Sequence, residues 1–88
     1  MLVRNHRYHV VKVCNELDVN LKEFLNLNTN FFVFSKHNSN KDADVHFHIY
    51  FELKEGLSLS KIQEIFDVER WCVEIVHCSR KDIIEYLS

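Results

Sequence analysis

The chain has 88 residues, 47% of them hydrophobic, with 11 basic and 13 acidic residues and a formal net charge of −2. This length allows one domain around a single modest core. The slightly negative charge argues against a nucleic-acid binder that relies on a generally basic surface, and no apolar stretch approaches the length of a membrane span.

The cysteines and the N-terminus indicate an intracellular protein. Cys14, Cys72 and Cys78 are odd in number, widely spaced and without a CxxC pair, which is typical of reduced thiols rather than disulfides or a zinc ribbon. The N-terminal sequence MLVRNHRYHVV lacks the apolar core of a secretory signal.

The first half of the chain predicts a strand, a helix and a second strand. Residues 7–14 are rich in β-branched and aromatic side chains and predict a strand. Residues 18–27 space their apolar side chains as one face of a short helix, with Asp18 or Asn20 as its N-cap. A second strand is expected over residues 30–37.

The next elements are a third strand, a turn and a second helix. Residues 45–53 alternate strictly between apolar and polar side chains, as a strand with one buried face requires. Residues 54–57 contain the only glycine and predict a turn. Ser58 or Ser60 then caps a helix that runs to residue 66.

A fourth strand and a last helix complete the predicted order. The strand is expected over residues 71–77, and a capping box of Ser79 and Asp82 predicts the start of the helix. We therefore expect an α+β fold: a ferredoxin-like or RRM-like antiparallel sheet of four or five strands in the order βαββαβ, followed by a C-terminal helix.

The strand VHFHIYFEL, residues 45–53, carries a candidate metal site. Its period places His46 and His48 on one face, about 7 Å apart along the strand and able to bind one ion. His37 stands near the end of the neighbouring predicted strand and can supply a third imidazole, although the sequence leaves open which face it occupies. Further oxygen donors within reach are Asp42, Asp44 and Glu52, and the alternative is that these histidines are ordinary polar residues of a solvated face.

The last helix carries a candidate nucleophile. Ile83, Ile84 and Leu87 form its expected buried stripe, and Tyr86 lies roughly 100° from the centre of that stripe. A tyrosine at such a boundary often serves packing alone. A catalytic role requires a nearby cation or a substrate activated by a metal, because a phenol with a pKa near 10 is a poor nucleophile at neutral pH.

Three segments together resemble one family. VHFHIYFEL resembles the HUH motif, two histidines separated by one apolar residue within a strand, and CSRKDIIEYLS resembles the tyrosine motif that follows it. NFFVFSKHNSNKDADVHFH resembles the corresponding segment of plasmid replication initiators, with Ser35 where many viral members carry a glutamate. Over residues 7–88 the chain is thus similar to the single-tyrosine HUH endonucleases of rolling-circle replication initiators from plasmids and single-stranded DNA viruses.

The resemblance implies a complete activity. His46 and His48 would bind a divalent metal, Mn²⁺ or Mg²⁺, with His37 as the third ligand. Tyr86 would attack single-stranded DNA at a replication origin and form a 5′-phosphotyrosine bond. Residues 1–88 would then be one endonuclease domain of a longer replication protein in a host cell, accompanied by a helicase or oligomerisation region.

Other residues are candidates for binding the DNA. Arg80 and Lys81 are candidates for contacts with flanking phosphates, with a solvated first turn of the helix as the slightly favoured alternative. Lys36 and Tyr50 are further candidates for contacts with DNA. The aromatic side chains favoured for stacking on bases are Tyr50, Tyr8 and Trp71. Most phenylalanines of the strands are expected in the core, and the two histidines near the first strand, His6 and His9, on the surface.

Two other classes of function remain open from the sequence. The first is a non-catalytic RRM-like module for single-stranded nucleic acid, which would need exposed aromatic residues and a basic surface. The second is a small structural or regulatory domain that binds a partner. Neither requires the pair of histidines or Tyr86.

Overall fold

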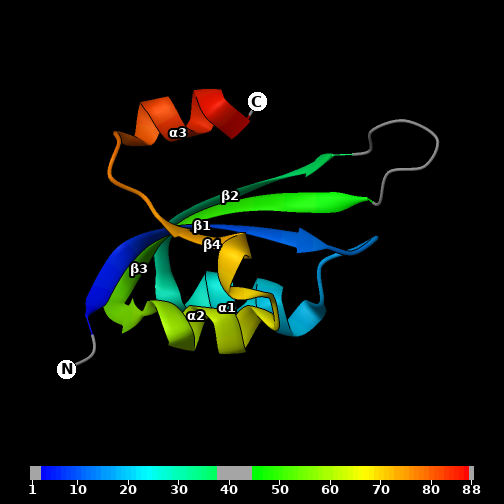
Figure 1. The fold of residues 1–88 in the computed structure, drawn as a ribbon, viewed down its shortest axis with the longest axis horizontal. Coiled ribbons are helices and arrows are strands. Elements are labelled where there is room, and N and C mark those ends of the chain that lie inside the picture. The colour runs from blue at the N-terminus through cyan, green and yellow to red at the C-terminus, as the bar shows by residue number, and fades with distance from the viewer. Residues whose placement is uncertain (1–2, 38–44, 88) are drawn as a thin grey trace.

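Two helices cover one face of a β-sheet and a third helix lies over the other face (Figure 1). The computed structural model describes residues 3–37 and 45–87. It contains a four-stranded antiparallel sheet of order β2-β3-β1-β4, three α-helices and a 3₁₀ turn. In chain order the elements are β1 Arg4–Val13, α1 Val19–Asn28, β2 Thr29–His37, β3 His46–Ser58, α2 Leu59–Phe66, the 3₁₀ turn Arg70–Cys72, β4 Val73–Ile75 and α3 Arg80–Leu87.

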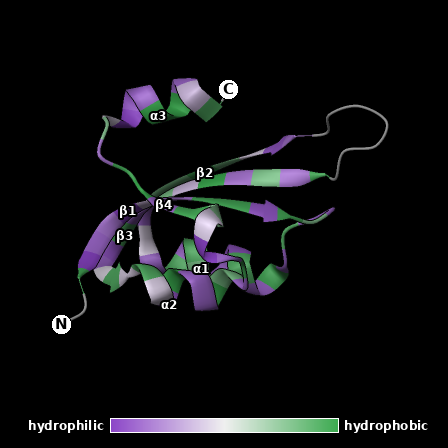
Figure 2. Ribbon diagram, in the orientation of Figure 1, coloured by the Kyte–Doolittle hydropathy of each residue, from purple (hydrophilic) through white to green (hydrophobic). Residues whose placement is uncertain are grey.

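This arrangement confirms the expected α+β class and is compatible with a ferredoxin-like arrangement. Within the described ranges, no helix is long and apolar enough to cross a membrane. Figure 2 shows hydrophobic and hydrophilic residues along each of the three helices, as expected of helices with one face on a sheet.

The main core lies between the sheet and helices α1 and α2. Phe51 of β3 stacks on Phe66 of α2 with ring centroids 5.3 Å apart, and Phe24 of α1 meets both rings edge-on. The fully buried residues of this core include Tyr8, Val10, Leu25, Ile49 and Ile62. The odd-numbered residues of the strand 45–53 therefore face the core, as their period predicts.

A smaller core lies on the opposite face, under α3. Ile83 and Leu87 of the helix pack with Val76 around Tyr50, which is completely buried. The helix thus covers the face of β3 that carries the even-numbered residues. This is the face that bears His46 and His48.

Helix ends follow the capping signals of the sequence. Asp18 accepts a hydrogen bond from the amide of Asn20 at 3.0 Å and caps α1. Ser58 is the N-cap of α2 and accepts from the amide of Lys61 at 3.3 Å. The hydroxyl of Ser79 accepts from the amide of Asp82 at 3.1 Å, which confirms the predicted start of α3.

The prediction of a turn at residues 54–57 is wrong, because β3 continues to Ser58. Its last residues pair with an extension of β1, Leu57 with Asn5 and Ser58 with Arg4, after an irregularity in the register. A Cβ at Gly56 would lie 3.2 Å from Cε1 of His6 on β1. The glycine therefore permits the close approach of the two strands instead of marking a turn.

The fourth strand is shorter than the predicted range of 71–77. Trp71 and Cys72 belong to the 3₁₀ turn, and β4 contains only residues Val73–Ile75. These three residues pair with β1 at the edge of the sheet. The apolar composition of the range indicated a strand, but only this part of it reaches the partner strand.

Arg80 fastens the start of α3 to the sheet. Its Nε and Nη2 donate to the two carboxylate oxygens of Glu52 at 2.8 and 2.5 Å, and its guanidinium carbon lies 4.1 Å from the ring centroid of Phe31. Glu52 also accepts from the hydroxyl of Tyr50 at 2.6 Å, and that hydroxyl accepts from Nε of Arg7 at 2.9 Å. The hydrogen bonds from Arg80 lower the pKa of Glu52, so acid weakens this attachment as pH falls through that lowered pKa.

We expect Arg80→Ala to loosen α3 without unfolding the sheet. A bidentate ion pair with Glu52 and a cation–π contact with Phe31 hold the start of the helix against the sheet, so hydrogen exchange of the α3 amides should accelerate severalfold when both are lost. Lys81→Ala is the matched control, because the neighbouring Lys81 is exposed. Equal acceleration in both variants would contradict an anchoring role for Arg80.

Candidate active site

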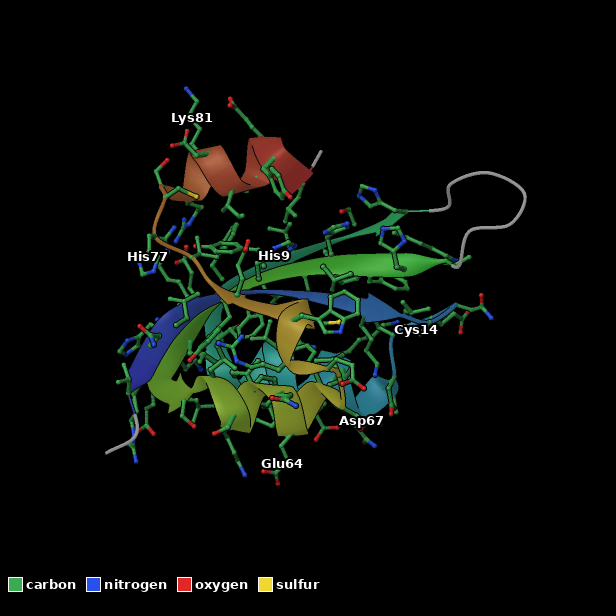
Figure 3. All side chains as sticks on the ribbon, in the orientation of Figure 1. His9, Cys14, Glu64, Asp67, His77 and Lys81 are labelled. Atoms are coloured by element: carbon green, nitrogen blue, oxygen red, sulfur yellow. The ribbon has the colours of Figure 1, made fainter. Side chains whose placement is uncertain are left out.

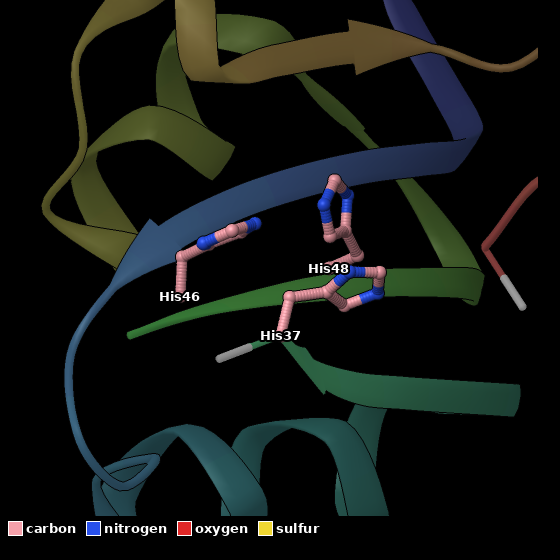
Figure 4. A group of neighbouring side chains, drawn as sticks. All are labelled: His37, His46 and His48. Atoms are coloured by element: carbon pink, nitrogen blue, oxygen red, sulfur yellow. The ribbon is translucent and has the colours of Figure 1, made fainter. Parts of the chain in front are cut away.

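Three histidines from two neighbouring strands form the candidate metal centre. In the antiparallel pairing of β2 with β3, His37 lies opposite His46 and Ser35 lies opposite His48. Residues directly opposite each other in a sheet project to the same face, which decides the side on which His37 lies. One ligand nitrogen from each of the three rings lies within 4.8 Å of the others (Figure 4).

The donor set fits a metal ion. Two nitrogens at about 2.1 Å from a tetrahedral ion lie about 3.4 Å apart, so modest rotations of these half-buried side chains would bring them into coordination distance. Imidazole suits first-row transition ions better than Mg²⁺, which prefers oxygen ligands. Of the two ions expected from the sequence, Mn²⁺ is therefore the better match.

The expected oxygen donors do not add to this centre. The carboxylate of Glu52 binds Arg80 and Tyr50 instead. Asp42 and Asp44 lie outside the described residues. Within residues 3–37 and 45–87, the centre thus consists of His37, His46 and His48.

His48 is held in its neutral form. Burial, and after it the nearby rings of His9, His37 and His46, together lower its pKa from 6.5 to about 4. A neutral imidazole offers a lone pair, which metal coordination requires. His48 is therefore ready to bind a cation at neutral pH without first losing a proton.

Ser35 orients the third histidine. Its hydroxyl lies 3.1 Å from Nε2 of His37 and donates to the backbone carbonyl of Leu87 at 3.3 Å. The carbonyl can only accept, so the hydroxyl accepts from Nε2–H of His37. This leaves Nδ1 of His37 as the nitrogen with a lone pair, and it links the centre to the last turn of α3.

The sequence interpretation missed His9 and Glu74. His9 was expected on the surface but is only 5% exposed, and it lies between the sheet and α3 (Figure 3). Its Nε2 is 3.0 Å from Nδ1 of His48, and its Nδ1 is 3.0 Å from Oε1 of Glu74. The alternation of β1 indicates only the face, because Tyr8 and Val10 point into the main core and His9 must point to the other side; it does not indicate that α3 covers that side.

Tyr86 lies on the same side of the sheet as the histidines. Its ring meets the ring of His9 edge-on, with centroids 6.0 Å apart, and its side chain is 70% exposed. Ile83 and Leu87 pack the helix against the sheet. Tyr86 therefore points away from the buried face of the helix and is exposed to solvent next to His9. The expected helical stripe, with Tyr86 outside it, is confirmed.

The candidate DNA-binding residues differ in their surroundings. Tyr50 and Tyr8 are completely buried, so neither ring can stack on a base in this structure, contrary to expectation. The buried hydroxyl of Tyr50 instead joins Arg7 to Glu52. Lys36, Lys81, Trp71 and Arg80 are exposed, although Arg80 is paired with Glu52.

The fold and the site together describe an α+β domain with a histidine centre beside a helix that bears an exposed tyrosine. Comparison of the chain with family models, with curated proteins and with solved structures found no significant match.

Proposed function

We propose that the chain is a metal-dependent domain that nicks and joins single-stranded DNA, of the HUH endonuclease class found in rolling-circle replication initiators. One observation carries the proposal: three imidazoles within 4.8 Å of one another share a sheet face with an exposed tyrosine. His9 joins the two, because it hydrogen-bonds His48 and its ring meets that of Tyr86.

In the proposed reaction Tyr86 is the nucleophile. Its phenolic oxygen loses its proton and forms a bond to the scissile phosphorus, the bond from phosphorus to the 3′ oxygen breaks, and that oxygen takes up a proton, so that no net proton is gained or lost. The products are a 5′-phosphotyrosine and a free 3′-hydroxyl, and attack by a 3′-hydroxyl in the reverse direction rejoins the strand. His37, His46 and His48 would bind the divalent ion. Its positive charge would offset the negative charge of the phosphate.

The remaining features of the proposal concern fold and context. The strand order β2-β3-β1-β4 supports a ferredoxin-like sheet of the kind that HUH domains use. We propose single-stranded DNA at a replication origin as substrate, with the exposed Lys36 and Lys81 as phosphate contacts. We also propose that the chain acts within a longer replication protein in a host cell, with a helicase or oligomerisation region.

The alternative of an RRM-like binding module is less well supported. Such modules stack bases on aromatic side chains of an open sheet face. Here α3 lies over the face that a free sheet would offer, and Tyr50 is buried beneath it. Among the proposed stacking residues, only Trp71 is exposed, and it lies in the 3₁₀ turn.

Covalent capture of DNA tests the proposal. We expect incubation with a labelled library of single-stranded oligonucleotides and Mn²⁺ to yield a protein–DNA adduct that survives a denaturing gel. Chelation of the ion should prevent it, and heat-denatured protein should form none. Binding of the library without any adduct across a range of divalent ions would favour the binding module and contradict the nuclease.

A further inference from the structure

Glu74, His9 and His48 form a chain of hydrogen bonds that ends at the metal centre. Glu74 lies on the edge strand β4, His9 on β1 and His48 on β3, and the two links are each 3.0 Å long. The rings of His9 and His48 are nearly parallel, at 12°, with centroids 5.2 Å apart. That separation exceeds a face-to-face stack and matches two rings joined end to end by one hydrogen bond in their common plane.

The carboxylate sets the direction of the chain. Glu74 is an acceptor only, so Nδ1 of His9 must carry a proton. A neutral His9 then has its lone pair on Nε2, and this nitrogen accepts from Nδ1–H of His48. A doubly protonated His9 would reverse the second link, but it would place a positive charge next to the proposed cation.

We propose that Glu74 and His9 are positioning residues that fix the tautomer of His48, with the proton on Nδ1 and the lone pair on Nε2 directed to the ion. This inference rests on the metal site of the proposed function and adds two residues to it. Metal-binding histidines commonly donate their second ring nitrogen to such a partner, and loss of the partner typically lowers metal affinity by 10- to 100-fold.

The surroundings of His9 suit this role. The ring is almost completely buried, and its contacts with Glu74, His48 and Tyr86 come from three different elements, β4, β3 and α3. Both ring nitrogens are occupied by these links. His9 therefore fixes the orientation of His48, and it has no free ring nitrogen with which to act as a base on the substrate.

Glu74→Gln is the decisive variant. The glutamine amide can donate as well as accept, so it removes the constraint on Nδ1 of His9 while it preserves the size of the side chain. The side chain of Glu74 is 63% exposed, so we expect the variant to fold. Glu69→Gln, at another exposed glutamate, removes the same charge and serves as the control.

Two measurements decide the inference. Long-range ¹H–¹⁵N NMR of the metal-free protein should find His48 protonated at Nδ1, with the Nε2-protonated form increased in Glu74→Gln and not in Glu69→Gln. Titration with Mn²⁺, followed by the electron paramagnetic resonance of the free ion, should give an affinity about 10- to 100-fold lower in Glu74→Gln alone.

Results that contradict the positioning role of Glu74 and His9 differ from those that contradict the proposed nuclease. A wild-type His48 protonated at Nε2, or equal Mn²⁺ affinities in the two variants, would overturn the positioning role. A wild-type protein that binds no Mn²⁺ would instead overturn the metal-dependent nuclease. The NMR measurement needs no metal and decides the tautomer in either case.

Discussion

Tyr86→Phe is expected to abolish the covalent protein–DNA adduct. The substitution removes only the phenolic oxygen, which is the proposed attacking atom, and loss of a covalent nucleophile typically lowers the rate by about 10⁴-fold or more. The exposed ring should keep its edge-on contact with His9, so affinity for Mn²⁺ should stay within about twofold of wild type. Denaturing gels of the labelled DNA measure the first effect and metal titration the second.

Glu85→Gln provides the control for this substitution, because it alters an exposed neighbour on the same helix. It should form the adduct at a rate close to that of wild type. An adduct that persists in Tyr86→Phe would contradict the assignment of the nucleophile. Tyr8 and Tyr50 are not expected to replace Tyr86 as the nucleophile, because both side chains are completely buried and out of reach of DNA.

The parts of the fold that follow from local chemistry were predictable. Strict alternation over residues 45–53 predicted both the strand and its two faces, because side chains on a strand alternate between its sides. Side chains that satisfy free backbone amides predicted where the helices start. They indicated Ser79 for the last helix, and for the other two they left a choice between Asp18 and Asn20 and between Ser58 and Ser60, which the structure decides for Asp18 and Ser58. These signals depend on residues close together in the chain, so no knowledge of the tertiary structure was needed.

The parts that depend on strand register were not predictable from the sequence. The face of His37 became defined only by its position opposite His46, and a shift of one residue would have turned it away from the centre. The continuation of β3 through Gly56 depends on pairing with Arg4 and Asn5. Such pairings join residues far apart in the chain, and no local pattern specifies them.

The same limit explains why His9 was missed. Its neighbours Glu74 and His48 lie on two other strands, and they approach it only because β1 runs between β3 and β4. A histidine between apolar residues in a strand has no local signal that separates a surface position from a buried polar link. The even-numbered face of β3 was recognised from sequence, but its cover by α3 came from the packing of Ile83 and Leu87.

His48→Ala is expected to remove metal binding while the protein stays folded. His48 is one of only three ligands identified among the described residues, and its loss should lower Mn²⁺ affinity by more than the roughly 100-fold upper range for an outer-shell partner. The side chain is only partly buried, on the face of β3 opposite the main core, so the variant should remain folded at pH 7. Metal titration, circular dichroism and the adduct assay measure these outcomes.

The variant should also change the dependence of stability on pH in the metal-free protein. Because the pKa of His48 falls from 6.5 to about 4 on folding, the unfolded chain binds a proton at a higher pH than the folded chain does. Acidification from pH 6.5 towards 4 therefore lowers the free energy of unfolding. His48→Ala removes that contribution, and urea unfolding at several pH values with a chelator present should give a flatter profile.

The control is His77→Ala, since His77 is exposed and outside the cluster (Figure 3). It should keep the affinity for Mn²⁺, the adduct and the acid sensitivity of the wild type. If His48→Ala unfolded at pH 7, the histidine would be a structural residue of the space under α3. If it bound Mn²⁺ as tightly as His77→Ala does, the three imidazoles would not form the metal centre, and the nuclease would lose its main support.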